Sequence, residues 1–193
     1  MSMASTHNTI TVAEFLYRHL ITRPVPRIDG IASLKKIERP LLVLRACKAE
    51  LATGGRQPFY DYDDDIIVMP PLAFFAIARV FTRSQVYAAT LLHELVHWTG
   101  HRRRLGRPLY TEMYDTDYCR EELVAELGAA LLCHDLGISS RPALPHARYL
   151  NVYLSALPNP AIDLSLALSH ANHAAAYLTT LTRRQLSGQN SLL

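Results

Sequence analysis

Apolar residues recur at spacings of three and four along most of the chain, and proline, glycine or charged turns separate these stretches. Residues with that spacing share one face of an α-helix, so the pattern predicts a mainly helical protein. The helices predicted in this way are residues 11–22, 72–80, 85–98, 117–135, 147–157 and 163–181. The spacing in residues 41–52 fits a helix or a strand, and the alanine, lysine and glutamate content of residues 46–52 favours a helix there. Ser84 and Asp117 are expected to cap two of them, and Gly100 and Gly137 to end those two.

One segment departs from the helical pattern. Two short apolar runs, residues 59–60 and 66–69, flank an acidic turn at residues 61–65. Such runs around a turn predict a β-hairpin, and Pro70 and Pro71 would end it. The expected fold class is therefore α+β, mainly helical, with a small hairpin.

The expected domain organisation has four parts. Residues 1–10 are expected to be a disordered leader, and residues 11–55 an N-terminal helical segment. Residues 56–184 would form the main domain, and residues 185–193 a loose tail.

Composition narrows the class of protein. The chain has 193 residues, of which 49% are hydrophobic and 19% charged, with a formal net charge of +3. This composition is globular, and no apolar run approaches the roughly 18 residues of a membrane span. The polar N-terminus does not resemble a secretory signal. Three cysteines without a C-x-x-C spacing predict no disulfide framework, so a reducing, cytoplasmic location without membrane partners is expected.

The residues that carry chemistry begin with His93-Glu94-Leu95-Val96-His97, on the helix predicted at residues 85–98. Two histidines four apart lie on one helix face, about 6 Å apart along the axis, where both imidazoles can bind one zinc ion. Glu94 would lie beside that ion and act as general base toward water. The alternative is a pair of hydrogen-bonded core histidines.

A catalytic zinc site needs a third protein ligand. The position of a third histidine in metzincins is occupied here by Arg103. The next strong helix offers Glu122 and Glu126, which lie four apart and share a face. Glu122 is predicted as the third ligand and Glu126 as the carboxylate that orients His93. The neighbouring Glu121 is expected to point toward solvent or Arg120, although exchanged roles of Glu121 and Glu122 remain an alternative.

Two further residues are candidates for supporting roles. Tyr118 lies four residues before Glu122 and could donate a hydrogen bond to a developing oxyanion, or simply fill the core. His101 could serve as a fourth ligand, orient a ligand, contact substrate or cap the helix. If His101 were a fourth ligand, the site would be structural rather than catalytic.

Basic residues cluster after the histidine motif. The cluster consists of Arg102, Arg103, Arg104 and Arg107. It could bind a phosphate backbone, such as that of single-stranded DNA, or form ion pairs with residues 61–65 and with Asp115 or Asp117. The second interpretation is the default one.

Several segments together resemble a known family. Residues 89–101, followed by Arg104, Leu105 and Arg107, are similar to the C-terminal zincin-like metallopeptidase domain of ArdC-type antirestriction proteins of mobile genetic elements. Residues 59–70, 118–132, 149–157 and 171–178 agree as well. The resemblance covers about residues 56–181 and implies a zincin-like fold with a His/His/Glu zinc site. In this chain Tyr153 replaces a tryptophan of the family, and residues 1–52 do not resemble the family's single-stranded-DNA-binding domain.

The resulting hypothesis is a zinc-dependent metallopeptidase that hydrolyses a protein or peptide substrate, with the hairpin forming a strand edge over the cleft. The main alternative is a non-catalytic antirestriction or single-stranded-DNA-associated protein with a structural or vestigial metal. A protease effector that travels with mobile DNA is a third hypothesis.

Overall fold

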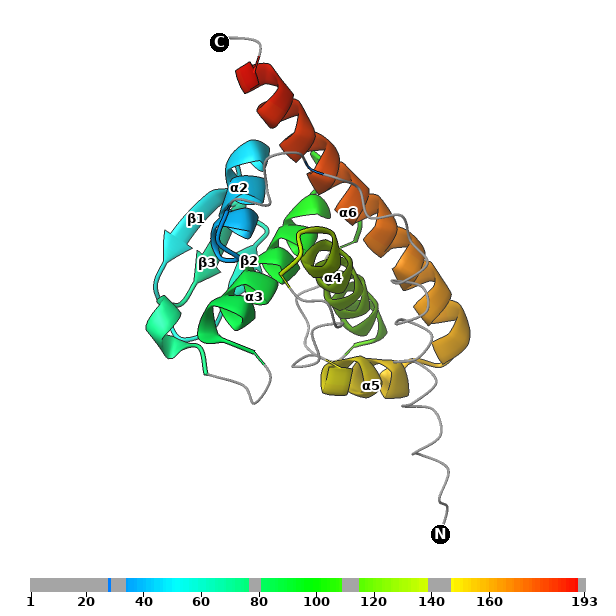
Figure 1. Cartoon of the computed structure of the whole chain (residues 1–193). Helices are drawn as coiled ribbons and strands as arrows, with labels where there is room; N and C mark the ends of the chain where they lie inside the picture. The colour runs from blue at the N-terminus through cyan, green and yellow to red at the C-terminus, as the bar shows by residue number, and fades with distance from the viewer. Residues whose placement is uncertain (1–27, 29–33, 77–80, 109–114, 139–146, 191–193) are drawn as a thin grey trace.

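A computed structural model describes residues 28, 34–76, 81–108, 115–138 and 147–190 of the chain. The described part is mainly helical, with one small sheet (Figure 1). In chain order its elements are α2 (Glu38–Cys47), β1 (Glu50–Thr53), β2 (Phe59–Asp61), β3 (Ile66–Met69), the 3₁₀ turn η2 (Leu72–Phe74), α3 (Arg83–Thr99), α4 (Thr116–Asp135), α5 (Ala147–Ala156) and α6 (Pro160–Asn190).

The helices and the sheet are arranged around α3 and α4. Helix α4 packs against both α3 and α6, and the sheet packs against α3 through β2 and β3 (Figure 1). Helix α5 packs against α4 and α6. The fold is therefore α+β as predicted, with the two central helices surrounded by other elements. Within the described ranges, no helix combines the length and the apolar character needed to span a membrane.

Helix α3 is buried around most of its circumference, which explains its nearly continuous apolar sequence. Leu91, Leu92 and Leu95 are each 0% exposed. The helix begins after Thr82, whose hydroxyl accepts a hydrogen bond from the Gln85 backbone N–H, while the Gln85 side-chain oxygen accepts one from the Thr82 backbone N–H. This reciprocal capping box fixes where the helix starts.

The sheet has the strand order β1-β3-β2, in which β3 pairs with β2 antiparallel and with β1 parallel. The predicted hairpin is confirmed, with Phe59 opposite Val68 and Asp61 opposite Ile66. Alternate residues of β3 face the core, since Ile67 and Met69 are completely buried. Strand β2 is left at one edge of the sheet.

The helix predicted at residues 41–52 is wrong in its second half. Helix α2 ends at Cys47, Lys48 adopts a left-handed conformation with φ 55°, and residues 50–53 form β1. The composition of this segment favoured a helix, but pairing with β3 supplies its backbone hydrogen bonds instead. The helix predicted at residues 11–22 and the leader at residues 1–10 lie outside the described residues.

Other boundaries also differ from the predictions. The helices at 85–98, 117–135, 147–157 and 163–181 are confirmed, but their caps are Thr82 and Asp115 rather than Ser84 and Asp117. Helix α6 continues through residue 190, so the tail predicted from residue 185 is helical up to that point. Of the helix predicted at 72–80, the described part forms only η2.

The contact between α3 and α4 depends on a glycine. A β-carbon added at Gly128 would lie 2.7 Å from Cγ2 and 3.0 Å from Cγ1 of Val96, which is inside normal contact distance. Val96 is β-branched and has little freedom to turn away within a helix. Gly128 therefore permits the close approach of the helix that carries His93 and His97 to the helix that carries Glu122.

A second set of contacts fixes the hairpin against the loop that follows α3. The Arg104 guanidinium donates hydrogen bonds to both carboxylate oxygens of Asp65, with Nη1 2.9 Å from Oδ2. It also lies over the Trp98 ring, 3.8 Å from the centroid. Tyr60 donates to Asp65 from β2, with 2.6 Å between its hydroxyl and Oδ1. These contacts hold β2 in place beside α3.

The Gly128 contact gives a test of the helix pairing. We expect Gly128→Ala to lower the free energy of unfolding by about 1–2 kcal/mol, because overpacking against Val96 outweighs the gain in helix propensity. The matched control is Gly188→Ala in α6, where no atom lies within 4 Å of the added carbon. Urea unfolding should show Gly188→Ala neutral or stabilising, and equal effects of the two substitutions would contradict the close approach.

The Asp65 contact gives a prediction about pH. Burial alone would raise the pKa of Asp65, but hydrogen bonds from Arg104 and Tyr60 overcome it and lower this pKa. The stabilisation is thus full above the ordinary Asp pKa of about 3.9 and disappears as the pH falls through the lowered value. Asp65→Asn, which tolerates the same left-handed backbone, should cost about 1–2 kcal/mol at pH 7 and progressively less in acid. Denaturant unfolding from pH 7 to pH 3 measures this, and a constant difference would contradict it.

Candidate metal centre

The Nε2 atoms of the two histidines in the motif face each other. His93 and His97 lie one turn apart on α3, and their Nε2 atoms are 3.1 Å apart. The rings meet edge to face, at 78°. Two nitrogen lone pairs cannot face each other at this distance without a proton or another cation between them. A shared proton in an N–H···N hydrogen bond, or a bound metal ion, would satisfy the pair.

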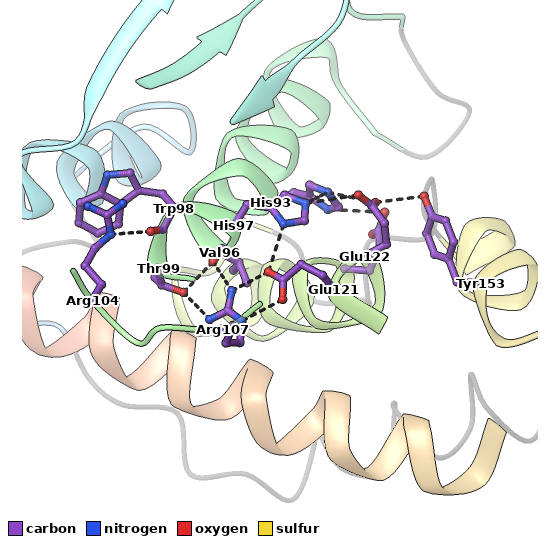
Figure 2. A network of polar contacts seen from close by, with 11 residues as sticks. His93, Val96, His97, Trp98, Thr99, Arg104, Arg107, Glu121, Glu122 and Tyr153 are labelled. Carbon is purple, nitrogen blue, oxygen red and sulfur yellow. Dashed lines mark hydrogen bonds and ion pairs between the residues drawn. The ribbon is translucent and has the colours of Figure 1, made fainter. Parts of the chain in front are cut away.

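Glu122 reaches the same point from α4. Its Oε1 lies 3.5 Å from Nε2 of His97, and its Oε2 lies 3.6 Å from Nε2 of His93 (Figure 2). One ligand atom from each of the three residues falls within 4.8 Å of the others, and this is the group of that kind found among the described residues. The structure brings together the three residues that the sequence analysis selected as ligands.

Each histidine has a carboxylate behind it. Nδ1 of His93 faces Oε1 of Glu126 at 3.6 Å, and Nδ1 of His97 faces Oε1 of Glu121 at 3.2 Å. A carboxylate at Nδ1 favours the tautomer that carries its proton there and leaves Nε2 free to bind a metal. The expectation that Glu121 points toward solvent or Arg120 is wrong: this side chain is 7% exposed and faces His97.

A buried arginine holds Glu121 in this orientation. Arg107 donates from Nε to Oε2 of Glu121 at 3.0 Å and from Nη2 to Oε1 at 2.7 Å. It also donates to the Val96 carbonyl at 2.7 Å and to the Thr99 hydroxyl at 2.9 Å, both at the end of α3 (Figure 2). Arg107 thus connects the C-terminal end of α3 to the carboxylate of α4 that contacts His97.

Glu94 occupies a different position from the other carboxylates. Its side chain is 5% exposed and lines the cleft beside His93 and His97. No hydrogen bond or ion pair joins it to another described residue, and burial raises the pKa of its carboxyl. A carboxylate held in this way accepts a proton more readily than one in water.

The metal-ligating candidates lie at the base of an open cleft of about 800 Å³. Strand β2 and the following turn contribute lining residues from the sheet, and α5 contributes Tyr149 and Tyr153. Tyr118 lines the cleft and is half-buried, with its ring 6.2 Å from that of Tyr153. The cleft is thus enclosed by the edge strand β2 and by α5, with the three candidate ligands between them.

Tyr153 is a site residue that sequence reasoning missed. Its hydroxyl donates to Oε2 of Glu122 at 3.1 Å (Figure 2). Burial, with Glu122 beside it, raises the pKa of Tyr153, so the phenol keeps its proton and remains a donor. The sequence offered one signal, since Tyr149 and Tyr153 lie four apart and share a helix face.

His101 lies away from this group. Its Nδ1 accepts a hydrogen bond from the Arg103 backbone at 3.1 Å, and its ring packs on Tyr62 at 4.7 Å. It does not line the cleft and does not belong to the group of ligating atoms. The contacts of His101 are with the loop after α3 and with Tyr62, and the residue is not part of the ligand group.

The arginine cluster is divided between two environments. Arg104 pairs with Asp65, and Arg107 is buried with Glu121. Arg102 and Arg103 are exposed. The ion pair with the acidic turn was predicted, whereas the burial of Arg107 was not.

The electrostatics of the three candidate ligands fit a cation. Burial alone would lower the pKa of His97, but hydrogen bonds to Glu121 and Glu122 raise it well above its ordinary value. Burial would raise the pKa of Glu122, but His97 and His93 hold it at about 2. The group therefore stabilises positive charge between its members and keeps Glu122 ionised. Two imidazoles and a carboxylate form a donor set that could bind a divalent metal, of the type found in catalytic zinc sites.

Comparisons with known proteins identify the family of the chain. The sequence profile of a zincin-like metallopeptidase family matches residues 42–170. Two proteins of Escherichia coli named DNA primase TraC are 31% identical to the chain over 83% and 86% of its length, which is 11% and 16% of theirs. The protein y4eC of Sinorhizobium fredii is 31% identical over 79% of the chain and 48% of its own length. The chain thus spans less than half of each of these relatives.

Solved structures of the antirestriction protein ArdC from plasmid R388 share this fold. The Mn(II)-bound structure has 27% sequence identity and a TM-score of 0.56, over 81% of this chain and 56% of ArdC. The metal-free structure gives the same identity and TM-score. The predicted resemblance to ArdC is confirmed. Because the family profile matches about two thirds of the residues, including the histidine motif and Glu122, the chain belongs to the zincin-like metallopeptidase family.

Proposed function

We propose that this protein is a metal-dependent peptidase that uses a zinc ion held by His93, His97 and Glu122. The observation that carries the proposal is the combination of three converging ligand atoms with a buried Glu94 that makes no hydrogen bond or ion pair within the described ranges, all in one open cleft. A structural zinc site is closed by four protein ligands, whereas three protein ligands leave a position for water. With His101 outside the group, three ligands remain.

A divalent ion bound there would supply Lewis acidity, which lowers the pKa of water and polarises a peptide carbonyl. Glu94 then has the role of the proton carrier: it accepts a proton from the attacking water and later gives it to the leaving amine. Its raised pKa suits both steps, because a carboxylate in water would hold the proton too briefly. We assign the orientation of the two imidazoles to Glu126 and Glu121, whose carboxylates lie 3.6 Å and 3.2 Å from the Nδ1 atoms of His93 and His97.

The two tyrosines near Glu122 receive different roles. The hydroxyl of Tyr153 donates to Glu122 and acts as a positioning group for this ligand. Tyr118 lines the cleft, and we assign to its phenol the hydrogen bond to the carbonyl oxygen on which negative charge develops.

The substrate would bind along β2. This strand lies at the edge of the sheet, pairs only with β3 among the described strands, and lines the cleft through Phe59, Tyr60 and Asp61. An edge strand presents unpaired backbone groups to which an extended peptide can add as a further strand. The substrate class that fits the proposal is therefore an extended segment of protein chain.

A second candidate is a DNA-associated or antirestriction role in which the metal is structural. It is favoured by the names of the relatives, a DNA primase and an antirestriction protein, and by the two exposed arginines Arg102 and Arg103. In this chain the other two arginines of the cluster are engaged by Asp65 and Glu121, which leaves less of the cluster to bind phosphates.

Substitutions of the metal ligands and of the general base Glu94 should have different effects on zinc content and on cleavage. His93→Ala and Glu122→Ala should remove stoichiometric zinc, as measured by elemental analysis after dialysis, because each deletes one of three ligands. Glu94→Gln should keep the zinc and lower cleavage of a mixed fluorogenic peptide library by at least about 100-fold, since it cannot carry the proton. His173→Ala, an exposed histidine of α6, is the matched control and should keep both. Hydrolysis at the wild-type rate by Glu94→Gln would exclude the mechanism.

The arginine behind Glu121 gives another prediction. Arg107→Lys keeps the charge but loses the paired hydrogen bonds to Glu121, so it should weaken zinc affinity by about tenfold through the freed carboxylate. Arg104→Lys is the matched control, because Arg104 makes the same kind of contact with Asp65, away from the ligands. Chelator competition at a temperature where both variants are folded measures the affinity. An equal loss in both variants would indicate a general effect of stability instead.

A further inference from the structure

The charge of the cleft differs from that of the whole chain. The chain carries a formal net charge of +3, yet six carboxylate residues and no lysine or arginine line the cleft within the described part of the chain. The lining carboxylates are Asp61, Asp63, Glu94, Glu121, Glu122 and Glu126. The cleft is therefore an acidic region in a slightly basic protein.

These carboxylates fall into two groups. One group faces the histidines and consists of Glu121, Glu122 and Glu126. Within it, Glu121 forms an ion pair with Arg107. Asp61 and Asp63 lie at the end of β2 and in the turn that follows, and neither has an ion-pair partner among the described residues. Asp65 in the same turn differs, since it is paired with Arg104 and does not line the cleft. Neither of these two aspartates belongs to the group of candidate ligands.

The walls of the cleft are aromatic as well as acidic. Phe59 on β2 is 48% exposed, and Tyr149 on α5 is 40% exposed. The Tyr149 ring stacks on Tyr153 at 6.4 Å and 24°. Aromatic faces beside carboxylates are the environment that binds an ammonium or guanidinium group, through cation–π contacts and charge pairing.

Resting on the proposed function, we infer that the cleft selects protein segments that carry lysine or arginine, and that Asp61 and Asp63 determine this selectivity. A cationic side chain on a peptide added along β2 would meet Asp61 at the strand end and Asp63 in the turn, with Phe59 on the same strand. The same charges repel a phosphate backbone, so nucleic acid would not enter the cleft. Glu94, which is buried and has no hydrogen bond or ion pair to another described residue, lines the same cleft.

The test compares peptides that differ only in charge. Labelled ten-residue peptides with two arginines, two glutamines or two glutamates at the same positions are titrated into the zinc-loaded Glu94→Gln chain, which binds without cleaving. Cleavage of the same peptides by the wild-type chain is measured in parallel. We expect the arginine peptide to bind at least about tenfold more tightly than the glutamate peptide at low salt, and this preference to shrink at 0.5 M salt.

The double substitution Asp61→Asn with Asp63→Asn should reduce the preference by about three- to tenfold, as expected for two partly screened charges. Asparagine at position 61 retains the side-chain oxygen that accepts the backbone N–H groups of Asp63 and Asp64, so the turn is preserved. Asp64→Asn is the matched control, because Asp64 is exposed in the same turn but does not line the cleft. It should leave the preference unchanged.

The outcomes separate this inference from the proposed function. If the arginine, glutamine and glutamate peptides are cleaved and bound equally well, the inference is overturned, while the proposed peptidase activity stands. If the arginine peptide binds more tightly but the wild-type chain cleaves none of the peptides, the inference is supported and the proposed peptidase activity is contradicted. Equal effects of Asp64→Asn and of the double variant, or tighter binding of a labelled single-stranded oligonucleotide than of the arginine peptide, would overturn the assignment of Asp61 and Asp63.

Discussion

The structure depends on how closely α3 and α4 approach each other. One helix carries both imidazoles and the other carries every carboxylate that contacts them, so the ligand group exists only while the two backbones are near. Gly128 permits this distance, because any side chain there would collide with Val96, a residue inside the histidine motif itself. Arg107 strengthens the same junction by binding the Val96 carbonyl and Glu121 together.

The second constraint is the burial of charge. Three glutamates, two histidines and an arginine are nearly removed from water at this junction, and each would be costly alone. They are stable because each has an opposite charge or a hydrogen bond nearby: Glu121 has Arg107 and His97, and Glu122 has both imidazoles and Tyr153. Glu94, a fourth glutamate here, is buried and has no hydrogen bond or ion pair to another described residue. A buried carboxylate without a partner is unfavourable for folding, and such a group is typical of a catalytic site.

The cleft adds a level of selectivity to this centre. Its base could hold a metal ion, while its rim combines an edge strand, exposed aromatic rings and two aspartates that have no ion pair with another described residue. Two arginines of the basic cluster, Arg104 and Arg107, form ion pairs with Asp65 and Glu121 within the fold and are therefore less available to bind nucleic acid. The distribution of charge therefore connects the peptidase proposal with a cationic protein substrate, even though the relatives include proteins named for roles with DNA.

The sequence by itself determined the parts that depend on local spacing. Helical periodicity identified α3 to α6, the acidic turn identified the hairpin, and the four-residue spacings brought His93 to His97 and Glu122 to Glu126 on shared faces. Only the tertiary structure decided what depends on distant partners. Strand β1 forms because β3 lies beside it, Glu121 turns inward because Arg107 and His97 receive it, and Tyr153 reaches Glu122 from a helix 31 residues away. Spacing along one helix fixes which side chains are neighbours, but the partner of a buried polar group on another element is set by packing, which no local pattern contains.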